Sequence, residues 1–257
     1  MSVRILLTND DGIMAEGLNA AYLALKADGH DVVVSAPSGE RSGSSHAVTL
    51  WRPIIVKKVL MPSGAYGQSV SGSPADASRM GFMLLNEPKI DLVISGVNND
   101  TNLAYDVNYS GTVGAALEAT VAGFPAVAIS VEKELPYDWD RVGKIVCRVA
   151  DLYKGWDIPE GVTLNVNIPQ KISADEFFWV SPHHATPYDY LEQKRLDSET
   201  IECVRYREKS ERLHPQETDV WHLTQGHITI SPLIPVGAHL ATLTRLSGKD
   251  PGAFPGA

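Results

Sequence analysis

Short, uninterrupted apolar runs alternate with helical patterns through the first part of the chain. Two such runs, residues 5–7 and 32–34, flank a segment with apolar positions at helical spacing that ends at Gly29. Strands without polar alternation are buried on both faces, as in a parallel sheet covered by helices. Because strand, helix and strand follow one another here, we expect a right-handed βαβ unit. The pattern predicts an α/β fold with a mainly parallel sheet.

The same rhythm continues as far as about residue 160. Ser73, Pro74 and Asp76 form a cap, a first-turn proline and a capping-box acid, which together are typical of a helix start. Met80 and Met83 follow at helical spacing, and we expect both in the core. Further strands are expected at residues 54–56, 68–70, 91–95 and 126–131, and helices at 74–85, 112–121 and 139–153.

From Val162 the texture changes to short strand-like segments. Residues 162–168 alternate, and residues 199–207 and 227–231 are typical of solvated or edge strands. Unpaired strand edges are a liability that proteins usually cover. We therefore expect a strand-rich arm and a homodimer or larger assembly whose interface uses residues beyond about Phe177.

The chain contains no internal repeat and no low-complexity linker. We expect a single domain over residues 1–257, with a Rossmann-like core at 1–160. Residues 161–247 are expected to form the arm and complete the sheet, and residues 248–257, rich in Gly and Pro, a frayed tail.

Composition narrows the class of protein. A formal net charge of -9 over 257 residues argues against binding to DNA or RNA, because a phosphate backbone requires a basic surface. The two cysteines form no CxxC pair, and no apolar run approaches the ~18 residues of a membrane span. With no signal-peptide pattern at the start, we expect a soluble, cytoplasmic protein without membrane contact.

The first strand ends in Asn9-Asp10-Asp11-Gly12. In open α/β sheets ligands bind outside the carboxyl ends of the strands. Two neighbouring carboxylates repel each other unless a positive charge lies between them, and a divalent cation with oxygen ligands is the usual solution. Asn, Asp and Gly are also the commonest turn residues, so a simple strand-ending turn is the alternative. The residues alone leave both open.

Other polar segments are expected at the same edge of the sheet. Ser42 lies in the Gly- and Ser-rich loop 38–45, which could complete a metal site or serve as a flexible connector. Residues 110–112 open a helix with small side chains, and free backbone N–H groups there favour phosphate. No GxGxxG follows the first strand, which excludes a dinucleotide site, and the eight histidines show no HExxH pairing.

Several spaced motifs together give the chain a family resemblance. Asp10-Asp11, the Arg41-Ser42-Gly43 loop, Ser95-Gly96-Val97-Asn98 and Tyr109 to Val113 occur in this order, with Gly72 to Asp76, Thr218-Asp219 and Gly226 to Leu233. In this respect the chain resembles the SurE family of stationary-phase survival proteins, which are metal-dependent 5'-nucleotidases and phosphatases.

The resemblance implies a three-layer Rossmann-like α/β core and a C-terminal arm exchanged between subunits of a homodimer or homotetramer. It also implies one divalent metal ion per subunit, Mg2+ or Mn2+, held by Asp10, Asp11, Ser42 and Asn98. Ser110, Gly111 and Thr112 would line the phosphate site. The catalytic residues would be Asp10, Asp11 and Asn98, with Asp10 chiefly a ligand and Asp11 also orienting the attacking water.

Two departures from the family pattern stand out. The family has a loop of the form Asn-x-Gly-x-Asn-x-Gly, and here Asp100 and Ala104 replace its glycines. In residues 13–17, the proline that the family commonly has before the last glycine is missing. The loop change is expected to alter substrate preference or catalytic rate.

We interpret the sequence as that of a divalent-metal-dependent phosphomonoesterase for nucleoside 5'-monophosphates, with 3'-nucleotides and other small phosphate esters as further candidate substrates. A nucleoside N-ribohydrolase is one alternative, although it needs a denser run of aspartates than Asn9-Asp10-Asp11. A metal- or nucleotide-binding sensor without turnover is another, and the altered loop at Asp100 motivates it.

Overall fold

The computed structural model describes residues 2–133, 135–183, 188–208 and 215–237. Nine strands form one sheet in the order β3-β4-β2-β1-β5-β6-β7-β11-β8. The strands are β1 (Arg4–Thr8), β2 (Asp31–Pro37), β3 (Val56–Leu60), β4 (Tyr66–Val70), β5 (Leu92–Asn98), β6 (Ala126–Val131), β7 (Thr163–Ile168), β8 (Ala174–Trp179) and β11 (His227–Leu233).

The sheet is mainly parallel, as the sequence predicts. Strands β4, β2, β1, β5, β6 and β7 run parallel to one another, whereas β3 pairs antiparallel with β4 and β11 antiparallel with β7. Because β1, β5 and β6 run the same way, their carboxyl ends meet at one edge of the sheet.

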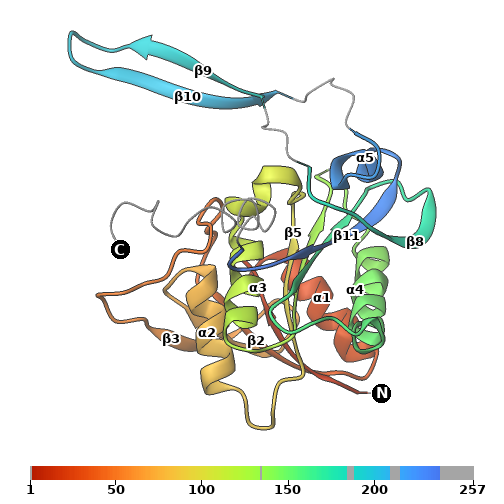
Figure 1. Ribbon diagram of the computed structural model, residues 1–257. Coiled ribbons are helices and arrows are strands. Elements are labelled where there is room, and N and C mark those ends of the chain that lie inside the picture. The colour runs from red at the N-terminus through yellow and green to blue at the C-terminus, as the bar shows by residue number, and fades with distance from the viewer. Residues whose placement is uncertain (1, 134, 184–187, 209–214, 238–257) are drawn as a thin grey trace, which may run out of the picture.

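Helices cover both faces of the sheet (Figure 1). Helices α1 (Glu16–Ala27) and α4 (Trp139–Tyr153) pack together on one face, and α2 (Pro74–Leu84) and α3 (Gly111–Val121) on the other. Each face has its own apolar core, one built around residues such as Leu18 and Val146 and the other around Phe82 and Val113. The expected three-layer α/β architecture is confirmed.

The expectation that Met80 and Met83 lie in the core is wrong for Met83, which is 64% exposed, while Met80 is only partly buried. Helix α2 instead buries a face of small residues against the sheet. A Cβ atom added at Gly81 would lie 2.7 Å from Leu6, so the helix lies too close to β1 for long side chains at this face. Hydrophobic spacing alone pointed to the wrong face of α2.

Two strand expectations also need correction. The strand expected at residues 54–56 begins only at Val56, as β3. The segment at 227–231, expected as a solvated or edge strand, is the interior strand β11, because β7 and β8 pair with its two sides and α5 (Asp219–Thr224) packs on it.

The arm is a two-stranded hairpin of β9 (Tyr188–Arg195) and β10 (Ile201–Glu208) that projects from the rest of the molecule (Figure 1). Leu191, Leu196, Ile201 and Val204 on it are exposed. The tail expected at 248–257 lies outside the described residues. None of the helices in the described part of the chain has the length and apolar content to cross a membrane.

Candidate active site

Side chains from four segments meet in a cavity of about 940 Å3 at the carboxyl ends of β1 and β5. Two candidate carboxylates, Asp10 and Asp11, enter from the end of β1, and Asn98 from the end of β5. The other lining residues include Glu16, Glu40, Ser42, Asn99, Asp100, Tyr109, Ser110, Lys133 and Tyr137. The structure thus brings Asp10, Asp11, Ser42, Asn98 and Ser110 together, as the sequence predicts.

The turn after β1 is built by the residues that flank the aspartates. Asn9 donates from Nδ2 to the Gly12 carbonyl at 3.0 Å and accepts the Gly12 N–H at 3.1 Å. Gly12 has φ +101°, and a Cβ atom there would lie 2.9 Å from Gly39. The segment is therefore a turn, but Asn9 and Gly12 make it, which leaves the two carboxylates for the cavity.

Asp10 is buried and Asp11 is partly buried, and burial outweighs the hydrogen bonds that each carboxylate accepts. Asp10 is 4% exposed and accepts a hydrogen bond from the Thr112 hydroxyl, and burial raises the pKa of its carboxyl. Burial and then the charge of Asp10 raise the pKa of Asp11 to about 6. Asp11 Oδ2 is buried and has no hydrogen-bond partner among the described residues. The charged neighbours that shift these two pKa values, Asp10 and Glu40, are all negative.

Asn98 and Ser42 turn oxygen atoms to the same cavity. Asn98 Nδ2 donates to the Asp100 carbonyl at 2.5 Å, so its Oδ1 is the atom left for a ligand. The Ser42 hydroxyl donates to Glu40 Oε1 at 2.8 Å, which leaves the lone pairs of its oxygen free. Glu40 was not singled out from the sequence, because its surface loop gave no signal of its own.

The residues present fit a hard divalent cation. Two carboxylates, an amide oxygen and a hydroxyl oxygen form an all-oxygen ligand set of the kind that Mg2+ and Mn2+ prefer. A divalent charge would also relieve the repulsion that raises the pKa of Asp11, and it would give Asp11 Oδ2 a partner.

The three residues expected to line the phosphate site, Ser110, Gly111 and Thr112, lie at the start of α3 and have different roles. Ser110 is the N-cap, and its Oγ accepts the Val113 N–H at 3.1 Å. Gly111 allows the helix to approach β1, because a Cβ atom there would lie 2.8 Å from the Asp10 Cβ. The Thr112 hydroxyl donates to Asp10, so its side chain positions the carboxylate, and the Ser110 hydroxyl hydrogen and backbone N–H groups of this turn remain for an anion.

A buried amide network anchors the loop that follows β5. The Asn102 N–H donates to Asn167 Oδ1 at 2.8 Å, its Nδ2 donates to Ser130 Oγ at 2.8 Å, and its carbonyl accepts from Asn165 Nδ2 at 2.7 Å. The two asparagines from β7 went unrecognised from the sequence. Their signal was two amides at alternate positions of a strand that is otherwise apolar and, in the structure, fully buried.

The two positions at which the family has glycine differ in backbone conformation. Ala104 has φ +50°, the left-handed region that favours glycine, and Asp219 Oδ2 accepts its N–H at 2.7 Å. Asp100 is not among the residues with positive φ. Its side chain is exposed at the cavity, and its Oδ1 accepts the Thr101 N–H at 2.9 Å. Only the change to Ala104 strains the backbone.

The cavity is strongly acidic. Its described lining carries one lysine, Lys133, against the carboxylates of Asp10, Asp11, Glu16, Glu40, Asp100 and Asp106. Tyr137 also lines the cavity, and its hydroxyl donates to the Asn99 carbonyl at 2.9 Å. Burial, followed by the charges of Asp100 and Asp11, raises the pKa of Tyr137. Tyr137 therefore donates to the loop as a neutral phenol at ordinary pH.

Comparison with known proteins places this site in a family. Residues 5–186 match the family described as Survival protein SurE. A protein of Solidesulfovibrio magneticus named 5'-nucleotidase SurE is 36% identical over 253 residues, 96% of this chain and 97% of that protein. One of the same name from Caldanaerobacter subterraneus is 35% identical over 232 residues, 89% of this chain and 90% of that protein.

A solved structure of a SurE protein has a similar fold. The crystal structure of the SurE protein from Aquifex aeolicus superimposes with a TM-score of 0.80 at 28% identity, covering 95% of this chain and 98% of that one. The chain belongs to the SurE family.

Proposed function

We propose that this chain is a divalent-metal-dependent phosphomonoesterase that hydrolyses nucleoside 5'-monophosphates. The observation that carries the proposal is the pair of buried, under-satisfied carboxylates, Asp10 and Asp11, beside the N-terminus of α3. The relatives named 5'-nucleotidase SurE, aligned over most of the chain, support the reaction and the substrate class.

Asp10, Asp11, Ser42 and Asn98 would hold one Mg2+ or Mn2+ ion. When bound, such an ion polarises phosphoryl oxygens and lowers the pKa of a water molecule. Other residues of the chain hold these candidate ligands in position. Thr112 fixes one oxygen of Asp10, and Glu40 takes the hydroxyl hydrogen of Ser42, so the serine oxygen presents only lone pairs to the cavity.

Asp10 and Asp11 take different roles in the proposal. Asp10 has one oxygen held by Thr112, which makes it a fixed ligand. Asp11 Oδ2 has no partner among the described residues, so it can accept a hydrogen bond from the attacking water and orient it toward phosphorus.

The substrate's phosphate would lie between the start of α3 and Lys133. The Ser110 hydroxyl can donate to a phosphate oxygen, because its own oxygen already accepts the Val113 N–H. Free N–H groups of the first turn of α3 add positive potential, and Lys133, which lines the same cavity, supplies a formal positive charge. These groups offset the carboxylates only when a cation is also bound.

The test is release of inorganic phosphate from a panel of 5'- and 3'-nucleoside monophosphates, with and without EDTA. We expect hydrolysis of 5'-monophosphates that EDTA abolishes and that Mg2+ or Mn2+ restores. Asp140→Asn, a carboxylate change in the groove between α1 and α4, is the matched control and should keep full activity. Release of free base without phosphate would indicate an N-ribohydrolase, and binding without turnover a sensor.

We further propose that the β9–β10 hairpin assembles the chain into a homodimer or homotetramer. Its exposed Leu191, Leu196, Ile201 and Val204 lack a covering element in the described chain, and such edges favour pairing with another copy. Deleting residues 189–207 should reduce the mass measured by light scattering. A monomer in the intact chain at micromolar concentration would contradict the assembly but leave the phosphatase proposal standing.

A further inference from the structure

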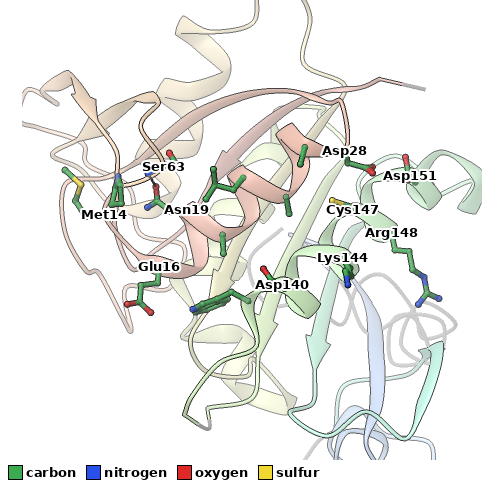
Figure 2. Close-up of a pocket in the computed structure, with 16 residues that line it drawn as sticks. Met14, Glu16, Asn19, Asp28, Ser63, Asp140, Lys144, Cys147, Arg148 and Asp151 are labelled. Atoms are coloured by element: carbon green, nitrogen blue, oxygen red, sulfur yellow. Dashed lines mark hydrogen bonds between the residues drawn. The ribbon is translucent and has the colours of Figure 1, made fainter.

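A second polar cluster lies at the opposite end of the sheet from the active-site cavity. His30 directly precedes β2, whereas Asp10 and Asp11 follow β1, and these two strands are parallel. The cluster closes one end of a groove of about 1130 Å3 between α1 and α4. Figure 2 shows Asp28 and Asp151 side by side at this end of the groove, with Cys147 beside them.

The centre of the cluster is a buried imidazole. His30 is 3% exposed, and its Nε2 atom makes no hydrogen bond with the residues that the structure describes. This nitrogen points between two carboxylates, 3.4 Å from Asp28 Oδ2 and 3.8 Å from Asp151 Oδ1. One ligand atom from each of the three residues lies within 4.8 Å of the others.

The separation of His30 Nε2 from Asp28 Oδ2 matches two ligands of one ion better than it matches a hydrogen bond. An N–H···O hydrogen bond would bring the nitrogen and oxygen to about 2.9 Å. Two ligand atoms bound tetrahedrally at about 2.1 Å from a zinc-sized ion lie about 3.4 Å apart, which is the 3.4 Å separation of His30 Nε2 from Asp28 Oδ2. Little movement is needed to accept such an ion.

The charges around the cluster leave it negative. Asp28 is the C-cap of α1, and Asp151 lies in the last turn of α4, which holds no basic residue. Helix C-termini carry partial negative charge, so two of them add to the two carboxylates. Burial and then the charges of Asp28 and Asp151 raise the pKa of Cys147 to about 11.

Lys26 and Arg148 hydrogen-bond to groups other than the carboxylates of Asp28 and Asp151. Lys26 Nζ donates to the His30 carbonyl at 3.2 Å, and Arg148 binds the Asp175 carboxylate at 3.1 Å and its carbonyl at 2.7 Å. Lys144 lines the groove but lies apart from Asp28 and Asp151 in Figure 2.

We propose that Asp28, His30 and Asp151 form a second divalent-cation site, distinct from the active site and suited to Zn2+. One imidazole nitrogen with two carboxylate oxygens favours a borderline ion such as Zn2+, whereas the all-oxygen set of the active site favours Mg2+ or Mn2+. Water would complete the coordination from the groove. The ion would join the end of α1 and the start of β2 to the end of α4, so its role is structural.

Ligation has a signature in the imidazole itself. The Val3 N–H donates to His30 Nδ1 at 3.4 Å, so without an ion the ring proton sits on Nε2. Binding of Zn2+ to Nε2 of the neutral ring moves that proton to Nδ1 and gives up the long Val3 contact. The ring nitrogens of His30 should exchange their NMR shifts when Zn2+ is added.

The experiment is Zn2+ titration by calorimetry of untagged protein that carries Asp10→Asn and Asp11→Asn, so that the active site does not contribute. We expect one Zn2+ per chain, with affinity reduced more than tenfold by Asp28→Asn or Asp151→Asn. Both side chains are about half exposed, so neither change should prevent folding. Asp140→Asn, on the same groove, is the matched control and should bind Zn2+ as the parent does.

Equal Zn2+ affinity in the parent and in Asp28→Asn and Asp151→Asn would overturn the proposal, as would a parent that binds no Zn2+. Unchanged His30 nitrogen shifts at saturating Zn2+ would do the same. With Asp10 and Asp11 intact, Asp28→Asn and Asp151→Asn should keep their Mg2+-dependent phosphate release. If the chain without any substitution released no phosphate, that result would contradict the proposed function and not the second cation site.

Discussion

Two groups of carboxylates in this molecule, one at the end of β1 and one in the helices α2 and α3, have different surroundings. At the end of β1, burial raises the pKa of both Asp10 and Asp11. In the helices α2 and α3, burial acts in the same direction on Asp76 and Glu118, but hydrogen bonds outweigh it and lower the pKa of both. Asp10, Asp76 and Glu118 are each less than 5% exposed, so exposure alone does not separate the two groups.

The helix carboxylates are saturated with donors. Asp76 accepts from the backbone N–H of Ser73 at 2.8 Å and from the Thr49 hydroxyl at 2.6 Å, and Glu118 accepts from Arg79 at 2.7 Å and His46 at 2.8 Å. These groups hold α2, α3 and the 46–49 segment together. Asp11 Oδ2, by contrast, has no hydrogen-bond partner among the described residues, at the edge of the sheet where a ligand is proposed to bind.

The largest effect should come from removing one charge of the strand-end pair. Asp11→Asn should lower divalent-metal-dependent phosphatase activity by more than about a hundredfold, because changing even a group that only supports a metal ligand typically costs 10–100-fold. Steady-state phosphate release measures it, with Glu16→Gln as a control in the same cavity. Full activity in Asp11→Asn would remove the metal assignment.

The saturated carboxylates should respond in stability instead. Glu118→Gln should lower the free energy of unfolding by about 2 kcal/mol, since charge-assisted hydrogen bonds to Arg79 and His46 are lost from a buried group. Urea denaturation measures it, with the exposed Glu160→Gln as control. If both variants unfold alike, the distinction between the two groups of carboxylates fails.

Removing the charge of Asp11 should have the opposite effect, because it should stabilise the metal-free chain at neutral pH. Its pKa is about 6 when folded and 3.8 in the reference state, so its favourable contribution is present below pH 3.8 and lost as pH rises through 6. In EDTA, Asp11→Asn should match the parent near pH 4 and exceed it by about 1 kcal/mol at pH 7, a value reduced for partial exposure. Thermal unfolding across this range, repeated with Mg2+, measures it.

The sequence predicted the order of strands and helices up to about residue 160 and the position of the carboxylates after β1, because apolar runs and turn residues are local signals. It could not show that α2 packs through small residues, which made Met83 look like a core residue, or that β11 is flanked on both sides. The sequence also could not show which residues hydrogen-bond to Asp10 and Ser42. Thr112 is 102 positions from Asp10, and Glu40 gave no local pattern.

Ala104, in the loop that lacks the family's glycines, tests backbone strain instead of charge, and its expected effect is smaller. Ala104 holds φ +50°, and Asp219, itself buried, binds its N–H. Ala104→Gly should stabilise the chain by about 0.5 kcal/mol, because relief of left-handed strain slightly exceeds the added freedom of the unfolded chain. Ala122→Gly, at a right-handed position after α3, should destabilise it slightly. A loss of stability in Ala104→Gly would show that position 104 is not strained.

The smallest expected effect belongs to Asp100, an exposed carboxylate at the mouth of a cavity that already lacks donors. At an effective dielectric constant of about 20, charges ~6 Å apart would repel by roughly 3 kcal/mol, but exposure and salt screen most of this. We therefore expect Asp100→Gly to raise kcat/KM for nucleotides about two- to fivefold, without weakening metal binding.

Asp100→Asn separates charge from backbone, because it keeps the side-chain oxygen that accepts the Thr101 N–H while removing the charge. If repulsion is the cause, Asn and Gly should give the same gain, and the gain should shrink as ionic strength rises. A gain in Gly alone would assign the effect to loop conformation. Unchanged kinetics in both would mean that Asp100 faces solvent without acting on the substrate, and a large loss of metal affinity would make it a ligand.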